Sequence, residues 1–199
     1  MKYQKMQTGW FMKNLFLLSF VLLLTVNCDR KNSRINSVTQ YYKALNNSDY
    51  NQVKSLITDS ITIVEGNYIM PYSHETFHEH FKWDSIFQPT YKLIALSETN
   101  DHVVATVAVN SLRFEFLKNN PLTCRHKIFF KSGKLTKFEN MDCIDADWTI
   151  WEKERDALVR WTSTHHPELD GFIHDLTMNG AINYLKAIAL YKENKSALR

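Results

Sequence analysis

Residues 38–66 read VTQYYKALNNSDYNQVKSLITDSITIVEG, and this stretch carries the signals of two helices followed by a strand. Apolar residues recur at three- and four-residue spacing from Ile35 to Leu45, which predicts a helix. Asn46-Asn47-Ser48 interrupts that pattern, and Asp49 is a good N-cap for a second helix. Ser60 to Tyr68 alternates and is rich in β-branched residues, which predicts a strand.

The sequence that follows predicts one more helix and then a series of strands. Ser73 can cap a helix that carries Phe77, Phe81 and Ile86 and stops before Pro89. Alternating apolar patterns then predict strands over Tyr91–Ser97, Val103–Leu117, Leu122–Lys131 and Lys134–Asp142. Helices followed by a meander of strands make the expected fold class α+β.

The predicted strand Val103–Leu117 changes its apolar face halfway. Val103, Ala105, Val107 and Val109 share one parity, whereas Leu112, Phe114 and Phe116 share the other. A β-bulge near Asn110-Ser111 would keep both halves pointing into one core and would bend the sheet into a cup. The alternative is two separate strands with a break at Asn110.

Residues 146–199 return to helical spacing. Trp148, Trp151, Leu158 and Trp161 predict one helix, and Ile182, Leu185, Ile188 and Ala189 predict a last one. An aromatic stripe at this spacing favours core packing over a ligand site. We expect a helical extension, residues 146–199, packed on the preceding domain.

The N-terminal residues have the layout of a secretory signal. Lys13 precedes an uncharged apolar run from Leu15 to Val26 that ends at Cys28. The run is about a dozen residues long, whereas a membrane span takes roughly 20. It resembles a bacterial lipoprotein signal, although Asn27 stands where small residues are usual. The resemblance implies a signal peptide over residues 1–27, a lipid on Cys28, a tether over residues 28–33, and a lipid-anchored place in the cell envelope, on the periplasmic side or at the outer membrane.

Composition excludes one class of partner. The chain has 24 basic and 21 acidic residues, and the three lysines of residues 1–27 are the only charges there, so the remaining chain carries 21 of each sign. Nucleic-acid binding needs a basic surface, so we expect no nucleic-acid partner.

Apart from Cys28, the chain has two cysteines, Cys124 and Cys143, which flank a predicted hairpin. Whether they form a disulfide or stay free thiols depends on the hairpin register.

The residues quoted first also carry a family resemblance. Tyr41-Tyr42-Lys43-Ala44-Leu45-Asn46, then Asp49, Leu56 and Asp59, resemble the opening of nuclear transport factor 2-like (NTF2-like) domains, a superfamily that includes ketosteroid isomerases and polyketide cyclases of the SnoaL-like type. The resemblance implies a cone-shaped, cystatin-like fold over residues 34–145, with a curved antiparallel sheet wrapped on the N-terminal helices. This fold hosts enzymes, binding modules and inert scaffolds alike.

The resemblance to the isomerases can be followed by residue. Tyr41 falls on their oxyanion-donating tyrosine, and Glu65 falls on their proton-shuttling aspartate. The third position, a second acid, falls on Arg125, with His126 beside it. His126 shares parity with the apolar face of its strand and would face Asn140 if the turn at Ser132-Gly133 had three residues. It is either a ligand-binding group or a buried histidine with satisfied hydrogen bonds. Tyr41, Glu65, His126 and Asn140 are the candidate pocket.

A second motif competes with this interpretation. His74-Glu75-Thr76-Phe77-His78 matches the H-E-x-x-H pattern of zinc proteases, with Glu98 at a spacing compatible with a third ligand. The motif falls in the first turn of a short predicted helix and Glu98 follows a strand, whereas such proteases use a long buried helix. His74 and His78 are weak metal-ligand candidates.

These observations lead to an expectation about function. We expect an envelope lipoprotein whose cup binds a small apolar ligand or a partner protein, including a second copy, with no catalysis and no cofactor. The alternatives are an isomerase- or cyclase-type enzyme that uses Tyr41 and Glu65, and a zinc-dependent hydrolase on His74, Glu75 and His78.

Overall fold

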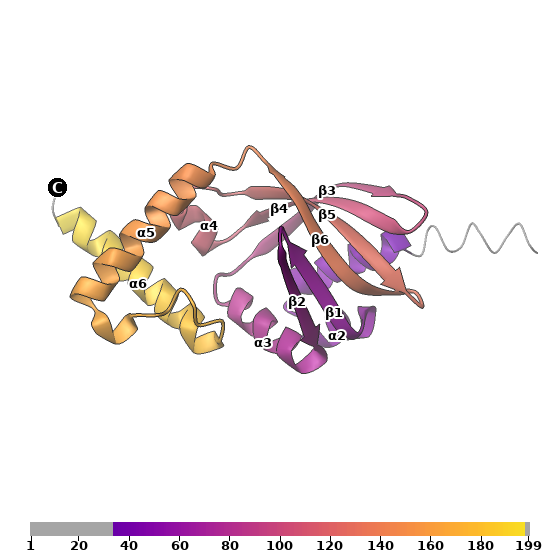
Figure 1. The fold of residues 1–199 in the computed structure, drawn as a ribbon, viewed down its shortest axis with the longest axis horizontal. Coiled ribbons are helices and arrows are strands. Elements are labelled where there is room, and N and C mark those ends of the chain that lie inside the picture. The colour runs from indigo at the N-terminus through magenta and orange to yellow at the C-terminus, as the bar shows by residue number, and fades with distance from the viewer. Residues whose placement is uncertain (1–33, 198–199) are drawn as a thin grey trace, which may run out of the picture.

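The computed structural model describes residues 34–197 of the 199-residue chain. Residues 34–46 are helical, and this N-terminal helix precedes the labelled elements of Figure 1. Along the chain these are α2 (Tyr50–Leu56), β1 (Ile57–Glu65), β2 (Tyr68–Ser73), α3 (His74–Ser85), β3 (Thr90–Glu98), β4 (His102–Asn110), α4 (Leu112–Phe116), β5 (Leu122–Lys131), β6 (Lys134–Ile144), α5 (Trp148–His165), the short 3₁₀ helix η1 (Pro167–Leu169) and α6 (Met178–Ala197). The Cys28 lipidation site, the signal peptide over residues 1–27 and the tether over residues 28–33 lie outside the described residues.

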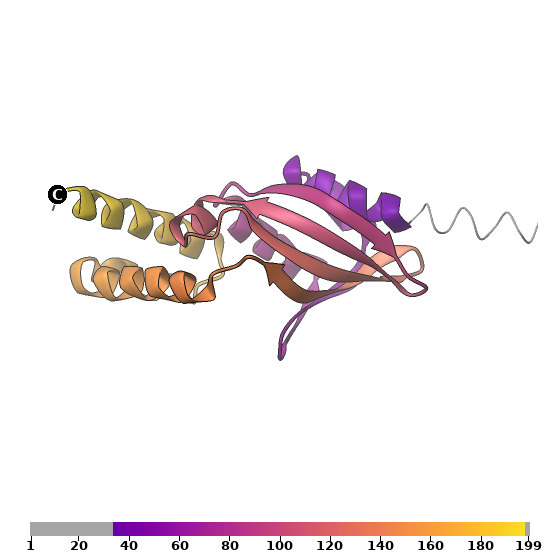
Figure 2. The same cartoon turned by 90° about the horizontal axis from the view of Figure 1, so that it is seen from above.

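The six strands form one curved sheet in the order β2-β1-β6-β5-β4-β3. All neighbours are antiparallel except β1 and β6, which are parallel, so the expected antiparallel sheet contains one parallel pair. The sheet curves around the N-terminal helix, as Figures 1 and 2 show. The first core lies between them; its fully buried members include Val38, Val53, Ile57, Ile61, Ile128 and Leu135. The fold is the expected α+β class.

Two sequence predictions about strands were wrong. The strand predicted over Ser60–Tyr68 is two strands, because Gly66 at φ 57° opens a two-residue turn that pairs Tyr68 back against Glu65. The strand predicted over Val103–Leu117 ends at Asn110. There the Ser111 side chain accepts a hydrogen bond from the Phe114 backbone N–H (3.1 Å) and starts α4. The change of parity marks a helix and not a β-bulge.

The β5–β6 hairpin combines a tight turn with irregular pairing. Ser132 and Gly133 make a two-residue turn with φ values of 51° and 81°. The register then shifts by one between Phe129 and Phe130, and again between Cys124 and His126. The His126–Asn140 pairing, expected from the sequence for a three-residue turn, is therefore reached with a two-residue turn, because the register shifts within the strands.

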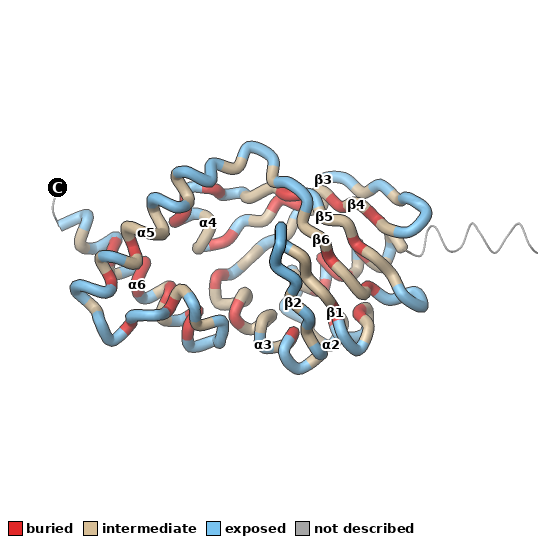
Figure 3. The backbone as a smooth tube through the Cα atoms, viewed as in Figure 1, coloured by how far each residue is buried: buried red, intermediate tan, exposed pale blue. Residues whose placement is uncertain are grey.

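The C-terminal helices build a second core. Figure 2 shows α5 and α6 side by side at the end of the molecule remote from the N-terminal helix, and α6 contacts α3 and α4. Leu158, Ala181 and Ala187 are fully buried there, together with Phe87 and Leu117 from the preceding segments. Figure 3 shows buried positions both within the sheet and between α5 and α6. Within the described residues, no helix is both long and apolar enough to cross a bilayer.

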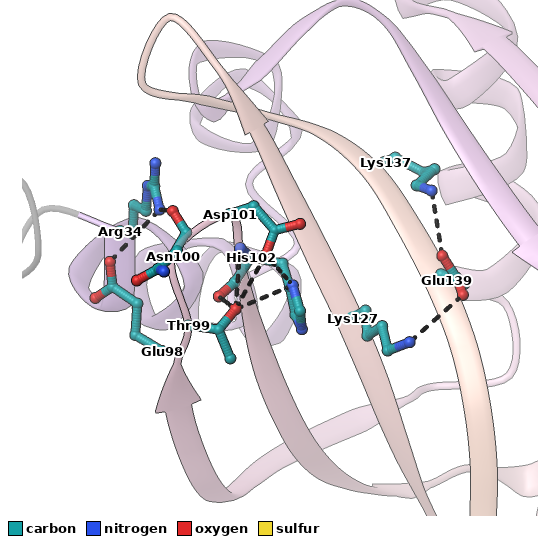
Figure 4. Close-up of polar contacts among 9 residues, drawn as sticks. All are labelled: Arg34, Glu98, Thr99, Asn100, Asp101, His102, Lys127, Lys137 and Glu139. Atoms are coloured by element: carbon teal, nitrogen blue, oxygen red, sulfur yellow. Dashed lines mark hydrogen bonds and ion pairs between the residues drawn. The ribbon is translucent and has the colours of Figure 1, made fainter.

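The opposite end of the molecule is fixed by ionic and polar contacts (Figure 4). Arg34 donates a hydrogen bond to the Asn100 backbone carbonyl (3.0 Å) and lies 3.7 Å from a carboxylate oxygen of Glu98. The Glu98 side chain is only 5% exposed, so this pair is shielded from solvent. The N-terminal helix therefore begins against the turn between β3 and β4.

Candidate functional site

Three polar side chains form a continuous row across neighbouring strands on the concave face of the sheet. Asn140 on β6 donates a hydrogen bond from Nδ2 to Oε1 of Glu65 on β1 (2.7 Å). Its Oδ1 lies 2.6 Å from Nδ1 of His126 on β5. The strand pairing explains the row, because Asn140 is the direct partner of Glu65 on one side and of His126 on the other. We call Glu65, Asn140 and His126 the polar row.

The polar row borders the first core. Side chains two positions apart on a strand share a face. On each of the three strands, the residue two positions from the polar side chain is apolar. These residues are Ile63 on β1, Phe138 on β6 and Ile128 on β5, and they belong to the first core or pack against it. On this face of the sheet, apolar side chains are therefore followed two residues later by a carboxylate, an amide and an imidazole.

The hydrogen bonds fix the protonation pattern of the polar row. Since Asn140 Nδ2 donates to Glu65, its Oδ1 is the atom that faces His126 and must accept from the Nδ1–H. Burial keeps the pKa of His126 below its ordinary value of 6.5, opposed by the hydrogen bond to Asn140 and the charge of Glu65. At neutral pH the imidazole is thus uncharged, with a lone pair on Nε2. Among residues 34–197, none forms a hydrogen bond with that atom.

α3 and β2 carry two titratable side chains, His80 and Tyr72, whose pKa values the Glu65 charge raises. Burial lowers the pKa of His80, with smaller effects from Asp84, Arg113 and Glu65. Burial raises the pKa of Tyr72, and the charge of Glu65 raises it further. The His80 and Tyr72 rings lie 5.4 Å apart. His80 is therefore a member of the site that the sequence analysis missed, and only the helical spacing of α3 could have suggested it.

Tyr41 packs beside the polar row without joining it. Its ring lies 5.0 Å from Phe138 and 5.3 Å from Tyr42, and it is only 6% exposed. Burial raises its pKa well above the usual range, followed by effects of Tyr42, Asp84 and Tyr50. Within the described chain no hydrogen bond joins Tyr41 to Glu65. The structure thus brings three of the four predicted pocket residues into direct contact and leaves Tyr41 in the core.

A disulfide lies next to the polar row. The structure joins Cys124 on β5 to Cys143 on β6, which are direct partners in the sheet. Cys124 is two residues from His126 along its strand, and the second register shift falls between them. The bond therefore crosslinks the two strands at the irregularity that separates it from the His126–Asn140 pair.

The H-E-x-x-H segment has other contacts. His78 stacks on Tyr50 with ring centroids 4.0 Å apart, and the Tyr50 hydroxyl donates a hydrogen bond to the His74 backbone carbonyl. Nε2 of His74 is buried without a hydrogen-bond partner among the described residues. Across residues 34–197, no group of three or more His, Cys, Asp or Glu side chains is arranged to hold a metal ion. The motif begins α3 and helps to pack it against α2.

Arg125, which fell on the position of the isomerases' second acid, forms an ion pair with another residue. It forms a bidentate pair with Asp142, at 2.7 and 2.8 Å. This exposed pair joins β5 to β6, and neither of its side chains is hydrogen-bonded to the polar row.

A pocket of about 280 Å³ opens between the end of the N-terminal helix, α3 and the start of β3. Its lining includes Leu45, Phe81 and Pro89, together with Asp84 and Tyr91. The Tyr91 hydroxyl donates a hydrogen bond to Asp84 (2.5 Å), so these two polar groups of the pocket are paired with each other. None of the three residues of the polar row is among the residues that line this pocket.

Comparisons with known proteins identify the fold. No protein-family model matches the sequence, and no curated protein matches it. Among solved structures, a protein from Kribbella flavida superposes with a TM-score of 0.50 at 10% identity, covering 63% of this chain and 95% of its own. An NTF2-like protein of unknown function from Cytophaga hutchinsonii gives 0.45 at 12% identity, covering 54% and 88%. A putative polyketide cyclase from Sinorhizobium meliloti gives 0.47 at 12% identity, covering 53% and 94%.

Identities this low establish the architecture alone and transfer no activity. The described chain has an α+β fold in which a six-stranded curved sheet, with one parallel pair, β1–β6, carries the N-terminal helix on its concave side. What it shares with the Kribbella flavida structure is this fold.

Proposed function

We propose that this protein binds a small, largely apolar molecule against the concave face of its sheet, with a hydroxyl or amide of that molecule donating a hydrogen bond to His126. The observation that carries the proposal is the polar row, in which Glu65 and Asn140 hold the imidazole in one tautomer. Placing three polar groups beside a packed core costs stability unless each is hydrogen-bonded. The row satisfies Asn140 and Nδ1 of His126, and it leaves Nε2 for a ligand.

Electrostatics favour a neutral donor at this position. The His126 imidazole is uncharged at neutral pH because burial lowers its pKa, and Glu65 supplies a negative charge nearby. A ligand O–H or N–H would therefore meet an acceptor and a carboxylate. The apolar residues along the same strands, such as Phe138 and Ile128, would contact the hydrocarbon part of the ligand.

A matched pair of probes tests this proposal. 2-Naphthol donates a hydrogen bond and 2-methoxynaphthalene does not, although their apolar bodies are nearly the same. We expect calorimetry to show about fivefold to tenfold tighter binding of 2-naphthol, which corresponds to one hydrogen bond of about 1 kcal/mol. His126→Leu should remove the difference between the probes.

The control for that variant is His174→Leu, since His174 is exposed in the loop before α6. It should leave both affinities unchanged. Equal binding of the two probes to the unaltered protein would contradict the role of His126, and no binding of either probe would contradict ligand binding by the concave face.

A second candidate function is proton transfer, favoured by the uncharged His126 and the Glu65 carboxylate at the two ends of the polar row. Such a pair can move a proton to or from a carbon next to a ligand carbonyl. The NMR spectrum of 1-tetralone in D₂O tests it: the enzyme hypothesis expects accelerated loss of the α-proton signal, abolished in Glu65→Gln. Tyr41, the donor suggested by the family resemblance, contacts Phe138 and Tyr42 instead. An unaccelerated exchange leaves binding as the function.

We also propose that the protein is anchored in the bacterial envelope through a lipid on Cys28. The sequence from Lys13 to Cys28 supports this, and so does the Cys124–Cys143 disulfide, since structural disulfides persist in oxidising compartments. Expression in a bacterial host with radiolabelled palmitate should label the protein, and Cys28→Ser should abolish the label. Unlabelled protein in the membrane fraction would contradict this mode of anchoring.

A further inference from the structure

Three buried nitrogen atoms on α3 and α4 have no hydrogen-bond partner among the described residues. They are Nδ1 of His80, Nε1 of Trp83 and Nε of Arg113. Trp83 as a whole is only 7% exposed, so its N–H is withdrawn from water. Each such group costs about 1–3 kcal/mol when it is left unpaired, and three of them in one place call for an explanation.

The three nitrogens belong to one stack of side chains from α3 and α4. The His80 and Trp83 rings lie 5.8 Å apart and nearly parallel, at 14°. The Arg113 guanidinium lies 4.8 Å from the centre of the Trp83 ring. Its charge acts on His80, where it opposes protonation. An unpaired cation and an unpaired indole N–H therefore lie against each other beside His80.

Arg113 lacks the carboxylate partner that three other arginines of the described chain have. Arg34, Arg125 and Arg155 each lie within 3.7 Å or less of a carboxylate oxygen. In the described part of the chain, Arg113 has neither an ion pair nor a hydrogen bond, and its guanidinium faces the rings of Trp83, Phe87 and Phe114 at 4.8–5.3 Å. Cation–π attraction explains where the guanidinium lies. It leaves the in-plane N–H groups, which are the hydrogen-bonding ones, without an acceptor.

We propose that Arg113 and Trp83 bind a carboxylate group of the ligand, with His80 at the same subsite. This inference rests on the proposed function, because the subsite would take the acidic end of the same molecule. A guanidinium matches a planar carboxylate through two parallel hydrogen bonds. One cation balances one monoanion, whereas a phosphate dianion would bury an uncompensated charge.

The position of His80 connects the two parts of the site. The His80 ring lies 5.4 Å from that of Tyr72 on β2, the strand paired with the Glu65 strand, and 5.8 Å from that of Trp83, so it lies between the β1–β2 pair and the carboxylate subsite. A ligand that reaches both would carry a hydrogen-bond donor and a carboxylate on one apolar body. The ligand class is therefore an apolar or aromatic hydroxy acid.

The test compares naphthalene-2-carboxylate with the neutral naphthalene-2-carboxamide, measured by calorimetry at pH 7.5 on the full chain. We expect the carboxylate to bind at least about tenfold more tightly, as a charge-assisted hydrogen-bonded pair implies. Arg113→Gln should lower the affinity for the carboxylate to that for the amide and leave the amide unchanged. Trp83→Phe, which keeps a ring and removes the N–H, should weaken carboxylate binding a few-fold.

Arg125→Gln is the matched control, since it removes an exposed arginine of the same sheet; it should alter neither affinity. The comparison of probes on the unaltered protein needs no variant, so misfolding of Arg113→Gln cannot hide the answer. Equal binding of both probes would overturn the carboxylate subsite while leaving ligand binding intact. If neither naphthalene derivative binds, both the subsite and the proposed function fail.

Discussion

The concave face of the sheet has two halves built on the same three strands. In the closed half, Ile63, Phe138 and Ile128 pack in or against the first core; in the polar half, the polar row takes their place. Only two positions on each strand separate the halves. The comparison of the two halves indicates that this fold can form a site by replacing one layer of apolar side chains with polar ones, without an added loop or insertion.

The register of β6 is what keeps the two layers in line. Asn140 pairs with His126 because the register shifts by one residue between Phe129 and Phe130, shortly before the hairpin turn. Without that shift Asn140 would point to the other face of the sheet, and the chain of hydrogen bonds from Glu65 to His126 would be broken.

The largest difference between the halves should appear in stability. Ile128→Ala removes a fully buried side chain of the closed half and should cost about 3 kcal/mol in the free energy of unfolding. Asn140→Ala in the polar half should cost about 1 kcal/mol, because it removes two hydrogen bonds at a partly exposed site. Urea denaturation measures both. Equal losses would mean that the polar row is as structural as the core.

The disulfide should contribute the next largest effect. Cys124 and Cys143 are 19 residues apart, and a closed loop of that size destabilises the unfolded chain by about 3 kcal/mol. We expect the double variant Cys124→Ala, Cys143→Ala to lose about that much. The reduced, otherwise unaltered protein serves as the control and should match the double variant. A variant as stable as the oxidised protein would show that strand pairing alone holds the polar half.

A smaller effect should depend on pH. Burial holds the pKa of His126 below its ordinary value of 6.5, so near that pH the unfolded chain binds a proton more readily than the folded protein. Stability is therefore complete above pH 6.5 and declines as the pH falls toward the folded pKa. His80, lowered by burial as well, adds to the decline.

Denaturation at pH 7, 6 and 5 measures this slope. His126→Gln should make it shallower, since one of the two buried histidines is gone, whereas His174→Leu should leave it unchanged. An unaltered slope in His126→Gln would place the proton uptake elsewhere.

The smallest effect should come from the Tyr41 hydroxyl. Tyr41 belongs to the closed half, where its ring contacts Phe138. We expect Tyr41→Phe to change the free energy of unfolding by less than about 1 kcal/mol and to leave the affinity for 2-naphthol as it is. A large loss of affinity would move Tyr41 from the core into the site.

Local patterns were sufficient to predict much of the fold. Ser73 caps α3 and the spacing of Phe77 and Phe81 marks its length, because caps and helical periodicity are properties of a few neighbouring residues. The bounds of β5 agree with its alternation. The Gly66 turn could have been found from its Gly-Asn pair.

The site was less predictable because it depends on contacts between distant segments. His126 and Asn140 could be proposed as a pair only for a three-residue turn, whereas the structure reaches the same pairing through a shift inside the strand. Periodicity does not locate such shifts. The stack of Trp83 and Arg113 joins α3 to α4, and α4 itself was predicted as part of a strand.

The Arg34–Glu98 contact has a consequence for how the protein would face its surroundings. It fixes the start of the described chain at the end of the molecule opposite α5 and α6 (Figures 1 and 4). The six residue steps from Cys28 to Arg34 can span at most about 20 Å. A lipid on Cys28 would thus hold the β3–β4 turn toward the bilayer and direct the helical pair outward.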